Sequence, residues 1–287
     1  MSIQLHQNIN LAIFLILGSL VAHIYLGWVD IATIIIFTIF IEHLFLYFNP
    51  KREFYFSYSA ISTAIGLIVL MYSANLWLYF FVITLALFQK HYITINNRHF
   101  FNPSNFAIII ALLFFYRDAH IISGQFGDEL WLSIIVLIIA LVMLIRVNRW
   151  IISVSFVASY FLLQYFLIIH YDPVLSFQMI YRRFYSVSFM LFIYFMLTDP
   201  VVTPQKSIYQ IGFGFLVALV SVLFDRYYGF RVQHLFMAVF ILSPFVTIFN
   251  SCRTKKDIII SVIVILFVAV TIITIEQKPP FYFEMEG

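Results

Sequence analysis

Two polar, proline-containing stretches in an otherwise apolar chain decide the fold: FFNPSNF at residues 100–106 and MLTDPVVTP at residues 196–204. In each stretch a short polar residue, Asn102 or Asp199, directly precedes a proline. The side-chain oxygen of such a residue accepts a hydrogen bond from a free backbone N–H, and proline needs no partner at the first position of a helix. The sequence therefore predicts that a helix begins at each stretch.

The helix that follows Pro103 is too short to cross a bilayer. Its apolar run ends at Tyr116 after 14 residues, about 21 Å of helix, whereas the hydrocarbon core is about 30 Å thick. We expect this helix to begin inside the membrane. Paired half-helices are typical of transporter-type binding sites, because their N-termini carry partial positive charge near the midplane. The alternative, that both stretches are ordinary ends of loops, stays open.

Composition sets the class of protein. Hydrophobic residues make up 63% of the chain and charged residues 10%, against about 45–50% and 25% in soluble domains. The sequence predicts an all-α polytopic membrane protein, one integral membrane domain over residues 1–287, with the lipid bilayer as its surroundings. Cys252 is the single cysteine, so the chain cannot form an intrachain disulfide, a cysteine-based zinc site or an iron–sulfur cluster alone. A net charge of +3 gives no indication of nucleic acid binding.

The apolar runs set the number of helices. Eleven runs lie near residues 9–27, 31–48, 59–73, 75–89, 103–116, 130–145, 150–170, 184–198, 208–224, 232–249 and 258–275. The stretch 54–89 has no acidic or basic residue over 36 positions; as one helix it would measure about 54 Å, so it must turn. We expect the turn at residues 73–75, one re-entrant segment among the eleven, and about ten transmembrane helices.

Basic residues indicate the orientation. If all eleven runs cross, ten Lys and Arg residues lie on one side and six on the other. The side with more basic residues is usually cytoplasmic. We therefore expect a cytoplasmic N-terminus.

Several polar residues fall in or beside apolar runs, where their burial is costly unless they have a role. Glu42 should face the bundle interior, either to bind a cation or proton or to pair with a neighbouring helix. Lys90 is expected to extend to the membrane surface, and Asp225 and Arg226 to form an ion pair in a loop. The candidates for an ion or substrate pathway are Glu42, Asn102, Asn105, Thr198, Asp199 and Thr203. No Walker loop, HExxH or nucleophile elbow is present, so no catalytic or metal-ligating residue is predicted.

The order of these features resembles the NqrB/RnfD family. The residues that carry the resemblance are Glu42, 59–67, Lys90, 101–103, 197–201 with Pro204, and 226–229, which together span most of residues 30–250. Members are membrane subunits of Rnf and sodium-pumping NADH:quinone reductase complexes. The resemblance implies ten helices in two inverted five-helix repeats, similar to urea transporters, with halves near 9–116 and 130–275. It also implies a flavin-bearing subunit of a cation-translocating electron-transfer complex in a bacterial inner membrane.

The chain departs from the family at its flavin site. Family members carry a Ser/Thr-Gly-Ala-Thr/Ser motif in the loop after the Asn-Pro helix, and its last hydroxyl is esterified to FMN. The matching residues here are Ser123-Gly124-Gln125-Phe126, and Phe126 has no hydroxyl. A glycine-rich turn before the Asn-Pro motif is replaced by residues 96–99, NNRH. We therefore predict no covalent flavin, while FMN or riboflavin held non-covalently stays open.

Three classes of function remain. The chain is an electron-carrying or scaffolding subunit of a redox complex with other membrane or redox subunits, a cofactor-free transporter or channel for a monovalent cation or small solute, or a membrane anchor without a substrate. The sequence does not decide whether the chain has enzymatic activity, and it does not identify the ion, solute or partner.

Overall fold

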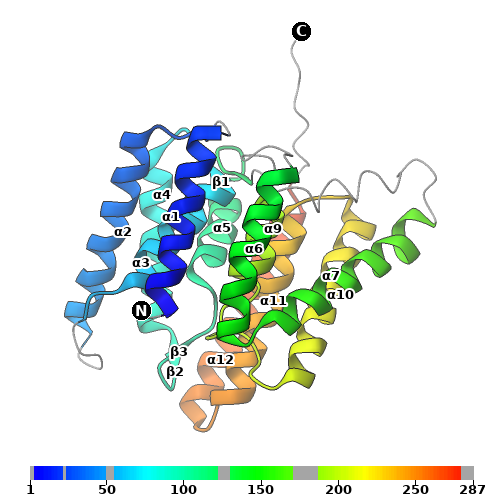
Figure 1. Cartoon of the computed structure of the whole chain (residues 1–287). Helices are drawn as coiled ribbons and strands as arrows, with labels where there is room; N and C mark the ends of the chain where they lie inside the picture. Colours follow the sequence, from blue (N-terminus) through cyan, green and yellow to red (C-terminus); the bar gives the residue numbers. More distant parts are fainter. Residues whose placement is uncertain (1–2, 22–23, 50–54, 122–129, 171–186, 279–287) are drawn as a thin grey trace.

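A computed structural model describes residues 3–21, 24–49, 55–121, 130–170 and 187–278, and nearly all regular structure in these ranges is helical (Figure 1). The helices are α1 Ile3–Val21, α2 Trp28–Phe48, α3 Tyr58–Leu70, α4 Leu76–Tyr92, α5 Pro103–Phe114, α6 Leu130–Val147, α7 Trp150–Gln164, η1 Tyr165–Ile169, α9 Val187–Leu191, η2 Phe192–Met196, α10 Ser207–Tyr228, α11 Gln233–Ser251 and α12 Lys255–Glu276. Two short antiparallel ladders pair β1 Met71–Tyr72 with β4 His120–Ile121, and β2 Thr94–Ile95 with β3 Arg98–His99.

Five of the described helices are long and apolar enough to cross a membrane. They are α2, α7 continued through η1, α10, α11 and α12. Helices α3 and α5 are apolar but shorter, with 13 and 12 residues. The chain is a multi-pass helical membrane protein, as its composition predicts. The number of crossings stays a prediction.

The turn predicted at residues 73–75 is confirmed. Helix α3 ends at Leu70, and Asn75 caps α4 by accepting the backbone N–H of Trp77 at 3.0 Å. The buried hydroxyl of Tyr79 donates to the Met71 carbonyl at 2.9 Å and accepts the Ser73 N–H at 3.2 Å. Backbone groups freed by the turn therefore find partners inside the protein, as a segment in a membrane requires.

The first proline stretch begins a helix as predicted. The side-chain oxygen of Asn102 accepts the N–H groups of Ser104 at 3.0 Å and Asn105 at 3.1 Å, and Pro103 is the first helical residue. Helix α5 is buried from Pro103 to Leu112 and packs against α3, α4, α11 and α12. The β2–β3 hairpin before it turns at Asn96 and Asn97, with φ of 49° and 62°. Asparagine tolerates this left-handed conformation, which explains how two asparagines serve where the family has glycine.

The second proline stretch does not begin a helix, so this prediction was wrong. Segment η2 ends at Met196, and the next helix, α10, begins only at Ser207. Asp199 instead accepts the N–H of Val201 at 2.9 Å, which closes a turn. Pro204 disfavours a helical conformation at Thr203, so the chain cannot continue as a helix from Pro200.

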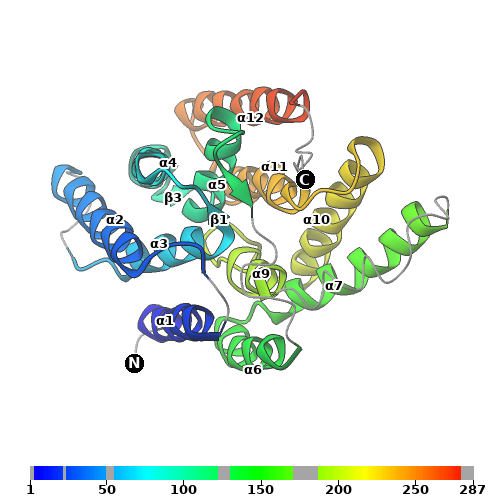
Figure 2. The ribbon, with the colours of Figure 1, turned by 90° about the horizontal axis from the view of Figure 1, so that it is seen from above.

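The helices pack in a similar order in the two parts of the chain (Figure 2). In the first part α1 contacts α3, α2 contacts α3 and α4, and α4 contacts α5. In the second part α6 contacts α9, α7 contacts α10, and α10 contacts α11. Helix α12 covers α11 and α5. This arrangement places α5, α9 and α11 near the centre of the view in Figure 2.

Candidate functional site

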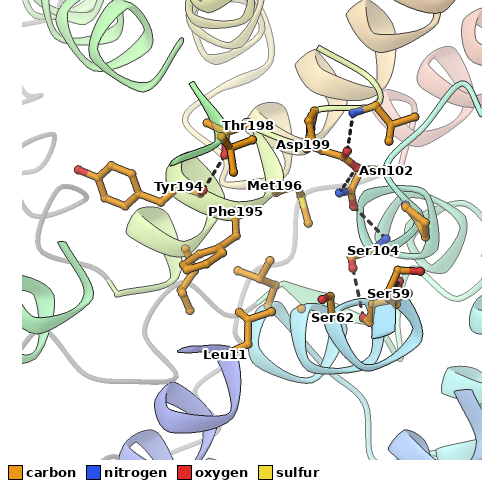
Figure 3. Close-up of a pocket in the computed structure, with 18 of the residues that line it drawn as sticks. Leu11, Ser59, Ser62, Asn102, Ser104, Tyr194, Phe195, Met196, Thr198 and Asp199 are labelled. Atoms are coloured by element: carbon orange, nitrogen blue, oxygen red, sulfur yellow. Dashed lines mark hydrogen bonds between the residues drawn. The ribbon is translucent and has the colours of Figure 1, made fainter. Parts of the chain in front are cut away.

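The two proline stretches meet at the centre of the molecule. The side-chain amide of Asn102 donates to Asp199 Oδ2 at 2.9 Å, across 97 residues of sequence (Figure 3). The contact joins the two polar turns that the sequence analysis singled out. The carboxylate of Asp199 is fixed on both sides, by Asn102 and by the Val201 N–H of its own turn.

A cavity of about 210 Å³ lies beside this contact. It has room for several water molecules or one small solute. Its polar wall consists of Ser59, Ser62, Thr63, Lys90, His99, Asn102, Ser104, Tyr194, Thr198 and Asp199. Apolar residues of several elements form the rest, among them Leu11 of α1, Leu70 of α3, Leu144 of α6 and Met196 of η2. A largely apolar concave surface with a few converging polar groups is typical of a binding site for a small ligand.

Three of the six predicted site residues line this cavity: Asn102, Thr198 and Asp199. Two others, Asn105 and Thr203, do not line the cavity. Asn105 donates to the Phe236 carbonyl at 3.2 Å and so joins α5 to α11. The hydroxyl of Thr203 donates to the Asp199 carbonyl at 2.6 Å and accepts from Arg149 Nε at 3.2 Å. These two residues connect elements around the site, and the sixth, Glu42, lies behind the cavity wall in contact with Lys90.

Glu42 is fully buried and paired with groups of neighbouring elements. Its carboxylate contacts Lys90 Nζ, accepts from Ser57 Oγ at 2.7 Å and lies 3.0 Å from His91 Nε2. Of the two alternatives left open by the sequence, this is the pairing with a neighbouring helix. The same pair corrects the prediction for Lys90, which is 6% exposed and does not extend to the membrane surface.

Lys90 stays inside because its charge is neutralised there. Beyond Glu42, its Nζ donates to Ser59 Oγ at 2.5 Å. Burial of an unpaired ammonium is costly, whereas a paired and hydrogen-bonded one is tolerated. Lys90 also lines the cavity, so the Glu42 cluster forms one side of the candidate site.

A second buried polar cluster was missed by the sequence reasoning. Asp225 was expected in a loop, but α10 continues to Tyr228 and Asp225 is 4% exposed. Its carboxylate accepts from Gln164 Nε2 at 2.8 Å and lies 2.7 Å from His234 Nδ1. Gln164, His234 and Glu276 were not singled out. The signal that could have found them is a polar residue at the end of an apolar run, which in a membrane protein needs a partner.

Two predictions are not decided by this geometry. The flavin-site residues Ser123, Gly124, Gln125 and Phe126 lie outside the described residues. The described residues contain no group of three His, Cys, Asp or Glu arranged to hold a metal ion.

Together, the apolar helices and the central cavity beside the short helix α5 describe a polytopic membrane protein with an internal cavity lined by polar and apolar side chains. The chain belongs to the NQR2, RnfD, RnfE family, whose model matches residues 110–259. The matched segment includes Thr198, Asp199 and Thr203, while Glu42, Asn102 and Asn105 precede it. No curated protein matches this chain.

Proposed function

We propose that this chain is a membrane subunit of an Rnf- or Nqr-type electron-transfer complex in a bacterial inner membrane. Membership of the NQR2, RnfD, RnfE family is the observation that carries this proposal. The partners would be the other membrane and redox subunits of such a complex. The chain itself contributes a buried polar cavity beside a half-helix, rather than a recognisable catalytic group.

The proposed architecture is two inverted five-helix repeats, α1–α5 and α6–α11, followed by α12, with about ten crossings. The similar packing order of the two parts supports it. Buried polar contacts support it as well, because Glu42 pairs with Lys90 between α2 and α4, and Gln164 with Asp225 between the corresponding α7 and α10. In this correspondence Asn102 precedes α5 and Asp199 follows α9, so the two residues occupy different positions of the repeat.

Within such a complex, the cavity would form part of the route of the translocated cation. Asp199 supplies a carboxylate there, and Thr198 and Tyr194 line the cavity beside it. Oxygen ligands of this kind suit a hard monovalent cation better than a transition metal. Replacing Asp199 with Asn would preserve the contact with Asn102 in shape but remove the charge.

Purification of the tagged full chain from its own membranes tests the proposal. We expect co-purification of flavoprotein or iron–sulfur subunits, identified by mass spectrometry, and loss of cation-dependent electron transfer in the Asp199→Asn complex. Isolation of the chain alone, without redox partners under mild detergent, would contradict a role as a complex subunit.

We also propose that the chain carries no covalent flavin. Phosphoester attachment needs a hydroxyl at the last position of the motif, and Phe126 offers none. A denaturing gel under ultraviolet light should show no fluorescence at the mass of the chain. A fluorescent band, with an FMN-sized mass increment on the peptide 118–129, would show that another hydroxyl is used.

The second candidate function is a cofactor-free transporter or channel for a small solute or ion. The cavity beside the Asn102–Asp199 contact is the observation that favours it. The visible spectrum of the native sample distinguishes the two, because a flavin absorption band that is lost on denaturation indicates FMN or riboflavin held non-covalently. A colourless chain that moves a solute across liposomes would support the transporter.

A further inference from the structure

A buried histidine lies between two carboxylates where α10, α11 and α12 meet. His234, in the first turn of α11, has no exposed surface. Its Nδ1 is hydrogen-bonded to Asp225 Oδ1 at the end of α10, at 2.7 Å. Its Nε2 faces Glu276 Oε1 at the end of α12, at 3.4 Å, a charge contact in which neither atom has a hydrogen-bond partner among the described residues. The side chain of Glu276 is 4% exposed and that of Asp225 is fully buried. Bulk water therefore does not compete with His234 for either carboxylate.

Hydrogen-bond counting favours one protonation state of this ring. A neutral imidazole has one N–H and one lone pair, whereas an imidazolium donates from both nitrogens. A carboxylate ion only accepts. A neutral ring would therefore donate to one carboxylate and turn a lone pair towards the other, while the imidazolium directs an N–H towards each of them. Such an unmatched contact is costly where water is excluded.

The charges of the neighbouring groups also favour the protonated form of His234. Arg231 lies between α10 and α11, and its Nη1 is 3.8 Å from Glu276 Oε2. Among the described residues, an imidazolium adds a positive charge between the two carboxylates and so favours their burial.

Other described groups from α7, from a residue after α5 and from the end of α12 lie around the cluster. From α7, Gln164 and Tyr160 contact the second oxygen of Asp225, at 2.8 and 3.5 Å. Tyr116, which follows α5, interacts electrostatically with Arg231 and Glu276 and contacts Gln233. Lys278 donates its protons to the carbonyls of Leu112 and Leu113, at 2.9 and 2.5 Å.

We propose that Asp225, His234 and Glu276 form a proton-binding site that holds α10, α11 and α12 together. This site is separate from the Asn102–Asp199 cavity, and it does not depend on which ion or cofactor the protein carries. Loss of the proton would leave His234 with one donor for two carboxylates and weaken the contact between these three helices. Because the carbonyl of Phe236, two residues after His234 on α11, accepts from Asn105 of α5, a movement here would also reach α5.

Magnetic resonance of the full chain in lipid nanodiscs, with ¹⁵N-labelled histidine, tests the protonation state directly. The His234 signals are those missing from the spectrum of His234→Gln. We expect two protonated nitrogens at neutral pH, and a change to a single protonated nitrogen as the pH is raised. A neutral ring over the whole range from about pH 5 to 8, in which histidine normally titrates, would overturn the proposal.

The pH dependence of thermal unfolding in detergent gives a second readout. The wild type should lose stability as the pH rises through the titration of His234, because the bonds made by the imidazolium are lost. His234→Gln cannot be charged, so it should lack this step. His170→Gln, the same change at an exposed position, should retain it. Identical profiles for His234→Gln and the wild type would contradict a proton site.

Glu276→Gln keeps the test decisive if His234→Gln fails to fold. This variant preserves the side-chain shape but removes one of the two charges that stabilise the imidazolium. We expect a smaller fraction of doubly protonated His234 at a fixed neutral pH than in the wild type. An unchanged fraction would show that Glu276 takes no part in binding the proton, and would overturn the site as proposed.

Discussion

Lys90 shows, at the scale of single residues, how this protein accommodates charge in an apolar interior. Its ammonium contacts the carboxylate of Glu42 and the hydroxyl of Ser59, which come from different elements. Such a pair adds little net stability compared with two apolar residues, but removing one member leaves the other charged and buried. The packing of α2, α3 and α4 therefore requires both Glu42 and Lys90.

Glu42→Gln should consequently destabilise the protein strongly. The variant leaves the Lys90 ammonium without a counterion, and breaking a buried pair in this way costs about 3–5 kcal/mol. The double variant Glu42→Gln/Lys90→Met removes the unpaired charge and should recover most of the loss. Unfolding in a denaturing detergent series measures both effects. If Glu42→Gln alone unfolds like the wild type, Lys90 has access to another anion or to water.

At the scale of elements, helix α5 ends inside the protein at both termini. Its first N–H groups are capped by Asn102, and Lys278 donates to the carbonyls of Leu112 and Leu113 in its last turn. A cation at this end also opposes the negative end of the helix dipole. Backbone groups at both ends of this twelve-residue helix therefore find side-chain partners, as a helix that ends within a membrane requires.

The contact between α7 and α10 depends on one glycine. A methyl group on Gly214 would lie 2.7 Å from the Ile152 carbonyl and 2.9 Å from the Phe156 nitrogen. Gly214→Ala should therefore push the helices apart and cost about 1–3 kcal/mol, the usual range for overpacking.

The matched control for Gly214→Ala lies two residues earlier on the same helix. A methyl group on Gly212 would meet nothing within 4 Å, so Gly212→Ala should be neutral or stabilising by up to about 1 kcal/mol through helix propensity. Thermal unfolding of the two variants side by side measures the difference. Equal stability of the two variants would mean that α7 and α10 are not in close contact.

Local sequence patterns were sufficient to predict helices but not pairings. The apolar runs predicted the helices near their observed positions, and residues 73–75 and Asn102 marked their ends correctly. The prediction for Asp199 was wrong because it used only the Asp-Pro pair, which is typical of the start of a helix. Pro204, five residues later, disfavours a helix there. Lys90 and Asp225 were misplaced because their partners lie on other helices, and no periodicity in one chain shows which helices meet.

At the scale of the whole molecule, the loops rich in basic residues gather at one end. The N-terminus, the β2–β3 hairpin and the connections α6–α7 and α11–α12 all lie towards the lower side of Figure 1, and the α1–α2 connection lies at the upper side. The lower loops include Arg98, Arg146, Arg149, Arg253, Lys255 and Lys256. Because such loops are retained in the cytoplasm, we propose that this end is cytoplasmic.

Cys252 tests this orientation without any added residue, since it is the single cysteine and lies partly exposed between α11 and α12. A membrane-impermeant maleimide should label it in inside-out vesicles and leave it unlabelled in intact spheroplasts. On a Cys252→Ser background, Tyr25→Cys places a thiol between α1 and α2, at a position that is 64% exposed in the wild type, and should give the opposite pattern. The reverse result for both cysteines would place the N-terminus outside, and with it the basic loops on the side that the charge rule disfavours.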